Sequence, residues 1–391
     1  MSIHGTVPLS SLVMFMKNGT TAGQNQEGRG LPVTRIETIA DGTINLNRVR
    51  HVELTDDDAI KWSLAPGDIL LSHINSVEHI GKSAIYVGVP SRLIHGMNLL
   101  LLRPNQNVVL PEFLHFGLRS AGVRAKMKAR CKQAVNQASI NQKELGQIEL
   151  TLPKLDEQHR MVDLLSRAEG IVRLRSEAQQ KAAELVPAIF LEMFGDPASN
   201  SKHWPLAKIE SICEVKTGAT PLRERKDFYE NGTVPWIKTG EVKNGEIFDA
   251  EERITDLAVS STNCKVFPTN TILIAMYGQG QTRGRCGILK VPASTNQACV
   301  AILPSEHIRH PYLFELFRLQ YERLRAMGRG GNQANLNMGM IKTFEVPIPP
   351  ENLQLEFERR IQFASSIQRQ QESALAISER VFASLLGKSF S

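Results

Sequence analysis

The chain lacks the features that mark membrane, secreted and zinc-binding proteins. No apolar run in its 391 residues is long enough to cross a membrane. The N-terminus lacks a basic stretch followed by an apolar core, so no secretory signal is expected. Cysteine is scarce: the five residues are widely spaced and form no Cys-x-x-Cys pair, which favours reduced thiols and supplies no zinc ligand set. We therefore expect a cytoplasmic protein without a bound metal.

Signatures of catalysis are also missing. Residues 81–83 and 156–159 together imitate a helicase ATPase, but the phosphate-binding loop needs a glycine where Ser76 stands. The acidic residues 156–157 follow a Leu-Pro-Lys turn rather than a buried strand, so they suit the first turn of a helix. We find no Asn/Asp-Pro-Pro-Tyr/Phe motif of a methyltransferase and no acidic cluster with a lysine for a nuclease. We expect a protein that is not an enzyme and needs no cofactor of its own.

The charge balance permits a nucleic-acid partner. The net charge is +6 and the isoelectric point is about 9.0. A basic surface attracts nucleic acid, yet many basic proteins bind none, so a second line of argument is needed.

That second line is an internal repeat of domain size. Residues 136–141 have the sequence Asn-Gln-Ala-Ser-Ile-Asn, and residues 332–337 have Asn-Gln-Ala-Asn-Leu-Asn. The two stretches lie 196 residues apart, and each precedes a proline-containing turn and a long helical pattern. Solenoid repeats have periods of about 20–50 residues, so this period is far too long for a solenoid. The repeating unit is therefore a whole domain followed by a helix.

The repeat divides the chain into four segments. We expect a first globular domain over residues 1–153, a long helix over 154–197, a second globular domain over 198–350 and a second long helix over 351–391. Both globular segments mix short strand patterns with turn residues, whereas both helical segments carry apolar residues at steps of three and four. Pro187 should kink the first helix or end its regular part.

Two single apolar stripes of equal length favour pairing as a coiled coil. We expect an α+β fold: two similar mixed α/β domains separated by two long antiparallel helices, related by an approximate internal two-fold repeat. The alternative is that each helix packs on its own domain.

The order of these segments resembles the specificity subunit of type I restriction–modification systems. The resemblance covers essentially the whole chain and rests on order and duplication rather than on one motif. The second helix departs from the pattern, because residues 351–354 (Glu-Asn-Leu-Gln) stand where the first helix has a Glu-Gln pair. The matching residues are Leu152, Pro153, Leu155, Glu157 and Gln158 at the head of the first helix, 192–197 at its end, 332–336 and 347–350 before the second helix, and 384–386 with Phe390.

The resemblance implies a non-catalytic reader of double-stranded DNA. Each domain would recognise one half of a bipartite, asymmetric site, and the helices would set the spacer between the halves. The helices would also dock two modification (adenine methyltransferase) subunits, and motor/endonuclease subunits would join the full complex. No membrane partner is implied. The residues that the resemblance assigns to partner binding are Glu157, Gln158, Met193, Phe194 and Phe357.

Two polar loops are the candidates for base recognition. Arginine and lysine can pair with guanine, and asparagine and glutamine with adenine. Residues 276–285 and 73–83 follow corresponding strand patterns but differ in nearly every polar residue, as two different half-sites would require. The alternative is a solvated hairpin tip. The candidates are Tyr277, Gln279, Gln281, Arg283 and Arg285 in the second domain, and His73, Asn75, Ser76, His79 and Lys82 in the first.

Basic and amide side chains before the long helices suit phosphate contact. A turn in which these amides cap the local backbone is an equally good interpretation. Arg223 and Arg225 belong to a short basic run that is more often a solvated face. The candidates before the helices are Lys132, Gln133, Arg329, Asn332 and Gln333.

Two rival functions stay open on sequence alone. A coiled-coil scaffold would bind DNA without sequence preference, although helices under forty residues are short for that role. A DNA-dependent ATPase resembling a helicase is the second rival, and the missing glycine argues against it.

Overall fold

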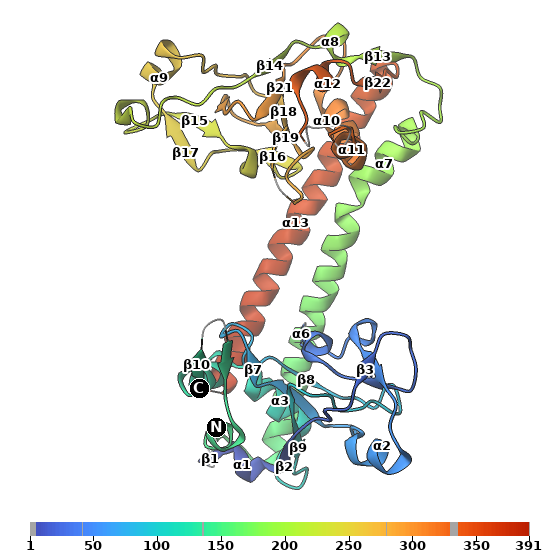
Figure 1. Ribbon diagram of the computed structural model, residues 1–391, viewed down its shortest axis with the longest axis vertical. Helices are drawn as coiled ribbons and strands as arrows, with labels where there is room; N and C mark the ends of the chain where they lie inside the picture. Colours follow the sequence, from blue (N-terminus) through green and yellow to red (C-terminus); the bar gives the residue numbers. More distant parts are fainter. Residues whose placement is uncertain (1–4, 41, 135–136, 279, 329–334, 391) are drawn as a thin grey trace. The chain divides into compact units, whose positions relative to one another are not determined.

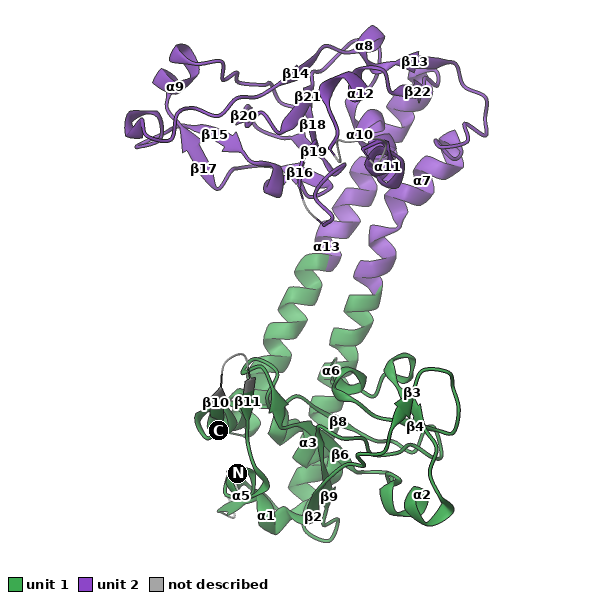
Figure 2. Ribbon diagram, in the orientation of Figure 1, with its two compact units in different colours: residues 1–177, 372–391 green, residues 178–371 purple. Residues whose placement is uncertain are grey.

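The computed structural model describes residues 5–40, 42–134, 137–278, 280–328 and 335–390. The chain forms two compact units, which Figure 2 distinguishes by colour. Unit 1 comprises residues 1–177 and 372–391, and unit 2 comprises residues 178–371. Each unit contains one α+β domain together with segments of both long helices, so the α+β fold class predicted from the sequence is confirmed.

Unit 1 is built on an antiparallel four-stranded sheet in the order β2–β9–β6–β8. Its strands are β2 (Val13–Asn18), β6 (Ile69–Ser72), β8 (Ser83–Ile85) and β9 (Leu99–Pro104). Every residue of β6 is buried, as expected for a continuous apolar run in the middle of a sheet. The helical pattern after residue 110 forms two helices, α3 (Pro111–Arg119) and α4 (Ala121–Ala129), because Ser120 adopts an extended conformation and caps α4.

Smaller elements surround this sheet. A second sheet, β3–β5–β4, forms an outer lobe, while β10–β11–β7 and β1–β12 are short antiparallel sheets. The remaining elements of unit 1 are β1 (Thr6–Pro8), α1 (Leu9–Leu12), β3 (Gln24–Asn25), β4 (Leu31–Val33), η1 (Ile36–Ile39), η2 (Leu46–Arg48), β5 (Arg50–Val52), α2 (Asp56–Trp62), β7 (Ile74–Asn75), β10 (Lys132–Ala134), β11 (Gln137–Ser139), α5 (Gln142–Gly146) and β12 (Glu149–Thr151).

Unit 2 repeats the arrangement with one added strand. Its sheet has the order β14–β21–β18–β19–β16, in which only the β16–β19 pair is parallel. Figure 2 shows the second sheet, β17–β15–β20, as an outer lobe beside it, and Figure 1 shows its strands β15 and β17. The elements are β13 (Leu206–Lys208), α8 (Ile209–Ile212), β14 (Val215–Thr217), η3 (Lys226–Phe228), β15 (Val234–Ile237), η4 (Thr239–Glu241), β16 (Gly245–Ile247), β17 (Glu252–Ile254), α9 (Asp256–Ser261), β18 (Ile272–Ala275), β19 (Cys286–Leu289), β20 (Ser294–Thr295), β21 (Cys299–Ile302), α10 (His310–Leu319), α11 (Tyr321–Met327), α12 (Met338–Lys342) and β22 (Glu345–Pro347).

The long helices are α6 (Leu155–Ala183), α7 (Leu185–Phe194) and α13 (Glu351–Ser389). The first helical segment is interrupted at Glu184. Proline has no amide hydrogen, and its ring clashes with the carbonyl four residues earlier, which for Pro187 is that of Ala183. The interruption expected from Pro187 is therefore confirmed, three residues before the proline itself.

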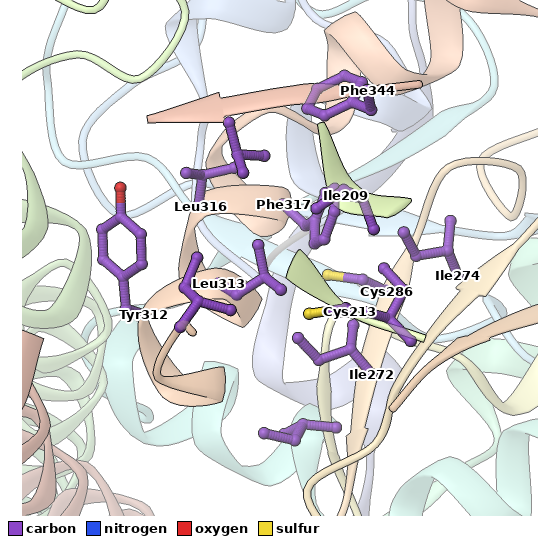
Figure 3. Close-up of a cluster of buried hydrophobic side chains, with 14 of the residues drawn as sticks. Ile209, Cys213, Ile272, Ile274, Cys286, Tyr312, Leu313, Leu316, Phe317 and Phe344 are labelled. Carbon is purple, nitrogen blue, oxygen red and sulfur yellow. The ribbon is translucent and has the colours of Figure 1, made fainter. Parts of the chain in front are cut away.

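The core of unit 2 joins the sheet, α10 and the long helices. Figure 3 shows Ile272 and Ile274 of β18 beside Leu313, Leu316 and Phe317 of α10. Phe190 and Phe194 of α7 and Phe357 of α13 belong to the same buried cluster. Their rings are paired at centroid distances of 5.1–5.6 Å.

Within unit 2 the two helices run antiparallel. The Gln368 amide donates to the Ala182 carbonyl at 2.9 Å, and Arg360 lies 3.5 Å from Glu192, so the numbering rises along one helix as it falls along the other.

In unit 1 the long helices meet the core at their opposite ends. Met161 and Leu165 of α6 lie in one buried cluster with Leu386 of α13 and Phe390, and the Phe390 ring packs on Phe113 at 4.9 Å. Each domain therefore holds the start of the helix that follows it and the end of the other long helix. Packing on the chain's own domain and helix pairing, weighed as alternatives from the sequence, both occur within the units.

Each domain has a glycine at the same place, where another part of the backbone approaches it closely. A Cβ on Gly19 would lie 2.0 Å from the Gly96 carbonyl oxygen, and one on Gly218 would lie 1.8 Å from that of Thr295. Both glycines follow the first strand of the central sheet of their domain, where no side chain fits between the two backbones.

Candidate nucleic-acid interface

The loop of residues 276–285 joins β18 to β19 and is closed by backbone hydrogen bonds. Gly284 N donates to Ala275 O at 2.9 Å, and Arg285 N donates to Thr282 O at 3.1 Å. Leu336 N donates to Met276 O at 3.1 Å. The last contact places the segment before the second long helix against the base of this loop, although the two are about sixty residues apart in the sequence.

Helix α11 supports the loop from one side. The Tyr321 hydroxyl donates to Gln281 O and the Arg325 guanidinium donates to Gly280 O, both at 2.6 Å. Gly284 has φ +85° and packs on the backbone of Arg325, a conformation and a closeness that favour glycine. These contacts fix the loop backbone, so its polar side chains start from defined positions.

The side chains predicted to recognise bases are partly available. Tyr277 and Gln281 are exposed, and Gln281 Oε1 accepts from the Arg285 guanidinium at 2.9 Å. Arg283 is half-buried, and its Nε is buried without a hydrogen-bond partner among the described residues. Gln279 lies outside the described residues. The geometry therefore groups one aromatic ring, one amide and two guanidiniums on a braced loop.

The corresponding loop of unit 1, residues 73–83, joins β6 to β8. Its first residues form β7, which pairs with β11 so that Asn75 opposes Ala138. Ile140 N donates to His73 O at 2.9 Å, which is the counterpart of the contact between Leu336 and Met276. In both domains a backbone hydrogen bond therefore joins the loop to a described residue of the segment before the long helix, a juxtaposition that the sequence did not predict.

Five side chains of this loop were predicted to contact DNA, and they differ in accessibility. Ser76 and Asn75 are half-buried, and the Asn75 carboxamide donates to Ser72 Oγ at 3.3 Å and accepts from Ser76 N at 2.8 Å. His79 is exposed, whereas Lys82 is half-buried and its Nζ donates to Ala40 O at 3.1 Å.

The structure corrects the assignment of His73. Only 7% of this residue is exposed, and burial lowers the pKa of its imidazole, so little of the side chain is available to a base.

The residues predicted to contact phosphate have mixed outcomes. Lys132 is exposed at the start of β10, in the same small sheet as Asn75. Gln133 lies in the backbone of β10, but its side chain is outside the described part of the chain, as are Arg329, Asn332 and Gln333. Arg223 is paired with Glu252 at 2.7 Å, and Arg225 with Asp227 at 2.6 Å.

These pairs have electrostatic consequences. A hydrogen bond to Arg223 is the main cause that lowers the pKa of Glu252, and one to Arg225 lowers the pKa of Asp227. Both arginines thus already have a carboxylate partner, which a DNA phosphate would have to replace.

The structure also corrects three of the five residues assigned to partner binding. Phe194 and Phe357 are buried in the core of unit 2, and Gln158 is fully buried in unit 1. Burial inside their own unit prevents these side chains from facing another subunit. Glu157 and Met193 are half-buried, so part of each stays accessible.

Gln158 has a structural role that repeats in the second half. Its Oε1 accepts from Leu110 N at 2.9 Å, and its Nε2 donates to Pro153 O at 2.9 Å. Gln354 likewise accepts from Arg309 N and donates to Pro349 O, both at 2.8 Å. The second helix therefore contains the glutamine of the Glu-Gln pair, and only the glutamate is replaced, by Leu353.

An apolar surface on the long helices was missed from the sequence. In unit 2 an open groove of about 490 Å³ is bordered by Phe363, which is 71% exposed, and by Arg359 and Arg360. Leu185, Ile189 and Ile367 complete its apolar lining. The periodicity of apolar residues shows that a helix has an apolar stripe but not which part of it another element covers.

Unit 1 has apolar side chains at the positions that the repeat predicts. Leu164 and Ile171 of α6 and Val381 of α13 are each about half-exposed. They lie 196 residues from Arg360, Ile367 and Leu185, three of the residues that line the groove of unit 2. Both units thus present uncovered apolar side chains on the long helices.

Two further properties bear on the class of protein. Among the described residues, no group of three or more histidine, cysteine, aspartate or glutamate side chains is arranged to hold a metal ion. No helix in the described ranges is long and apolar enough to cross a membrane.

The fold and these loops define a class: a duplicated α+β domain that presents a different braced polar loop on each copy. Two segments, residues 6–184 and 201–361, match the family model described as the type I restriction modification DNA specificity domain. The chain belongs to this family.

Similar proteins agree with this assignment. Over 374 residues the chain is 30% identical to the putative type I restriction enzyme MjaX specificity subunit of Methanocaldococcus jannaschii, covering 90% of this chain and 84% of that one. Two solved structures share the fold. One, from work on complex assembly and conformational transition of the type I restriction–modification system, has a TM-score of 0.64 at 17% identity and covers 100% of this chain and 98% of the other. The S subunit from M. genitalium has a TM-score of 0.59 at 15% identity, with coverage of 100% and 97%.

Proposed function

We propose that this chain is the DNA-recognition subunit of a type I restriction–modification complex and that each domain recognises one half of a bipartite, asymmetric site in double-stranded DNA. The observation that carries the proposal is one scaffold present twice with a different polar loop on each copy. Identical half-sites would need identical loops, whereas residues 73–83 and 276–285 share few polar residues. The chain itself would supply recognition, and the methylation chemistry would belong to its partner subunits.

The accessible loop side chains carry the proposed base contacts. In the second domain these are Tyr277, Gln281, Arg283 and Arg285, since guanidiniums pair with guanine and carboxamides with adenine. In the first domain Asn75, Ser76, His79 and Lys82 take this role, without His73.

The apolar surfaces of the long helices carry the proposed partner contacts. A repeated surface suits two copies of one partner, so we assign one modification subunit to the groove beside Phe363 and one to the surface around Ile171. The helices would fix the spacer between the half-sites, and motor/endonuclease subunits would join the same assembly.

Genome-wide mapping of methylated adenine tests the proposal. The chain would be co-expressed with a modification subunit encoded beside it, in cells that lack other adenine methylation. A split motif with a fixed gap is the expected result. A stable complex that methylates no sequence, or only a continuous one, would contradict a two-domain reader.

Exchange of one loop tests the assignment of the half-sites. Replacing residues 276–285 by the corresponding loop of a relative should change one half of the methylated motif and leave the other half and the gap unchanged. A matched exchange of residues 73–83 should change the opposite half. If either exchange alters both halves, the domains do not recognise DNA independently.

A further inference from the structure

The positive charge of the first domain is gathered in one stretch of the sequence. Residues 113–143 contain seven lysines and arginines and no aspartate or glutamate, while the rest of residues 1–153 contains nine basic and twelve acidic residues. Apart from this stretch, the first domain is acidic. DNA that approaches this domain is therefore attracted to one part of its surface.

The second domain has the same net charge with a different distribution. Residues 198–350 have 19 basic and 15 acidic residues, against 16 and 12 in residues 1–153. In the stretch that corresponds to 113–143, residues 313–339, there are four arginines and two glutamates. Equal net charge thus hides a concentrated patch in one domain and a dispersed pattern in the other.

Three basic side chains between the end of α4 and the start of β10 are available in the first domain, whereas Arg124 and Lys126 of α4 donate to the Glu78 and Glu149 carbonyls. Lys128, Arg130 and Lys132 have neither an ion pair nor a side-chain hydrogen bond with any described residue. On the corresponding helix of the second domain, α11, the arginines are committed internally. Arg325 donates to Gly280 O at 2.6 Å, and Arg323 donates to Gln320 at 2.8 Å while it lies 4.8 Å from the Phe344 ring.

The available cations lie next to the proposed recognition loop. The Arg124 guanidinium of α4 donates to Glu78 O in that loop at 3.2 Å, and Lys128 is one helical turn further along the same face. Lys132 is in register with Ser139, which pairs with Ile74 of the loop. Side chains alternate along a strand, so Lys132 lies on the face of this sheet opposite buried Ala138.

We propose that Lys128, Arg130 and Lys132 form a phosphate-binding face that gives the first domain most of its sequence-independent affinity for duplex DNA. The described residues of α11 in the second domain offer no such face, so that domain depends more on its loop. The inference rests on the proposed function, because it assigns the DNA backbone as the ligand of a surface beside the recognition loop. Phosphate contacts position a protein on the duplex without reading its sequence, so this face sets affinity rather than the recognised motif.

The test is the salt dependence of DNA binding by the complex with the modification subunits. The variant K128Q/R130Q/K132Q would be compared with wild type on a duplex that contains the full site. A plot of log affinity against log salt has a negative slope, and each lost phosphate contact reduces the size of that slope by about 0.9. The three substitutions should lower the slope by about three and weaken binding on the order of 100-fold at about 0.15 M salt. The methylated sequence should not change.

A matched variant in the second domain controls for the loss of charge alone. Lys208, Lys243 and Lys265 are exposed and lack ion pairs with the described residues, so K208Q/K243Q/K265Q removes the same charge from a domain of the same net charge. It should lower the slope by less than one. If K128Q/R130Q/K132Q binds DNA with the slope of wild type, or if both triple variants lower it equally, the proposed face is wrong.

Two results separate this inference from the proposed function. A wild-type complex that methylates a split site but shows no effect of the triple variant would overturn the face alone. A wild-type complex that binds no specific duplex would overturn both. Should the triple variant fail to assemble, each single variant is expected to lower the slope by about one, and unchanged slopes in all three would refute the proposal.

Discussion

The two units build the same junction between domain and helix end with different side chains. In unit 2 the Phe194 ring contacts Phe190, Tyr312 and Phe357 at centroid distances of 5.1, 4.7 and 5.3 Å. In unit 1 Phe390, which lies 196 residues later, contacts one ring among the described residues, that of Phe113 at 4.9 Å. The repeat thus fixes where an aromatic side chain is placed, whereas the number of its partners belongs to each unit.

The features that the two units do share are mostly contacts to the backbone. Asn141 accepts from Glu144 N at 2.8 Å, and Asn337 accepts from Met340 N at 2.9 Å, each capping a short helix. The same holds for Gln158 and Gln354, which bond to backbone groups, and for Gly19 and Gly218, which lie against backbone carbonyls. A shared backbone needs these residues, while the side chains on the loops are free to differ.

The aromatic junction gives the largest expected difference between the units. Phe194→Ala should lower the free energy of unfolding of unit 2 by about 3–5 kcal/mol. Phe390→Ala should cost unit 1 about 1–3 kcal/mol less, because it removes two fewer aromatic pairs and each pair contributes roughly 0.5–1.5 kcal/mol beyond burial. Hydrogen exchange followed by mass spectrometry would measure each unit in one sample, with Phe194→Leu as the control that keeps most of the volume. Equal losses of protection would mean that ring pairing does not decide the difference.

A second comparison concerns acid. His115 of α3 and Glu315 of α10 occupy corresponding positions, 200 residues apart, and both are buried. Burial lowers the pKa of His115 from 6.5 to about 4, and burial raises the pKa of Glu315 against the opposing effect of Arg318. The histidine stays neutral in the folded domain, and the glutamate is easier to protonate there than in the unfolded chain.

The two shifts have opposite signs for stability. Because the folded pKa of His115 is depressed, its contribution to stability is complete above about pH 6.5 and is lost as the pH falls towards about 4. Because the folded pKa of Glu315 is raised, its contribution is complete below about pH 4.5 and is lost as the pH rises through the folded pKa. At this pair of positions, acid should therefore weaken unit 1 and favour unit 2.

From His115 alone, we expect the free energy of unfolding of unit 1 to fall by roughly 2 kcal/mol between about pH 7.5 and about pH 5. His115→Gln can still donate to Ser83 O and does not titrate, so it should remove that part of the pH dependence. Exchange rates of peptides from both units at the two pH values, corrected for the intrinsic rate, would provide the measurement. A wild-type unit 1 that keeps its stability at about pH 5 would contradict the assigned pKa of His115.

The sequence predicted the local and repeated features well and the long-range ones poorly. The long helices, the interruption before Pro187 and the loops that follow the central strands depend on periodicity and turn residues within a short window. The pairing of β7 with β11 joins segments about sixty residues apart, so no local pattern revealed that the loop is joined to the segment before the helix.

The sequence also did not show which apolar residues of the long helices are buried. Phe194, which matches a motif, and Phe357, which lies in the apolar stripe of the second helix, were assigned to a partner surface. Both are buried in their own unit, whereas Phe363 is exposed on the same helix as Phe357. An apolar residue in a helical stripe has the same sequence pattern in either case. Only the packing of α7 against α13 in unit 2 separates the covered part of the stripe from the uncovered part.

The smallest expected effect tests the glutamines that hold the helix heads. Gln158 makes three hydrogen bonds to backbone groups, with Leu110 N, Pro153 O and Val108 O, whereas Gln354 makes two. Alanine would leave these buried groups unpaired, at a cost of about 1–3 kcal/mol. Gln158→Ala should therefore destabilise unit 1 by about 1 kcal/mol more than Gln354→Ala destabilises unit 2.

Exchange of the Leu110 and Arg309 amides reports directly on the loss of the glutamine that accepts from each of them. Glu157→Ala, at a half-buried neighbour, should leave the exchange of Leu110 unchanged. Gln158→Glu keeps an acceptor for Leu110 N but directs a carboxylate oxygen at the Pro153 carbonyl, so at neutral pH it should be at least as damaging as alanine. If Leu110 stays protected in Gln158→Ala, the glutamine does not hold the helix head. The two domains would then share this residue for another reason.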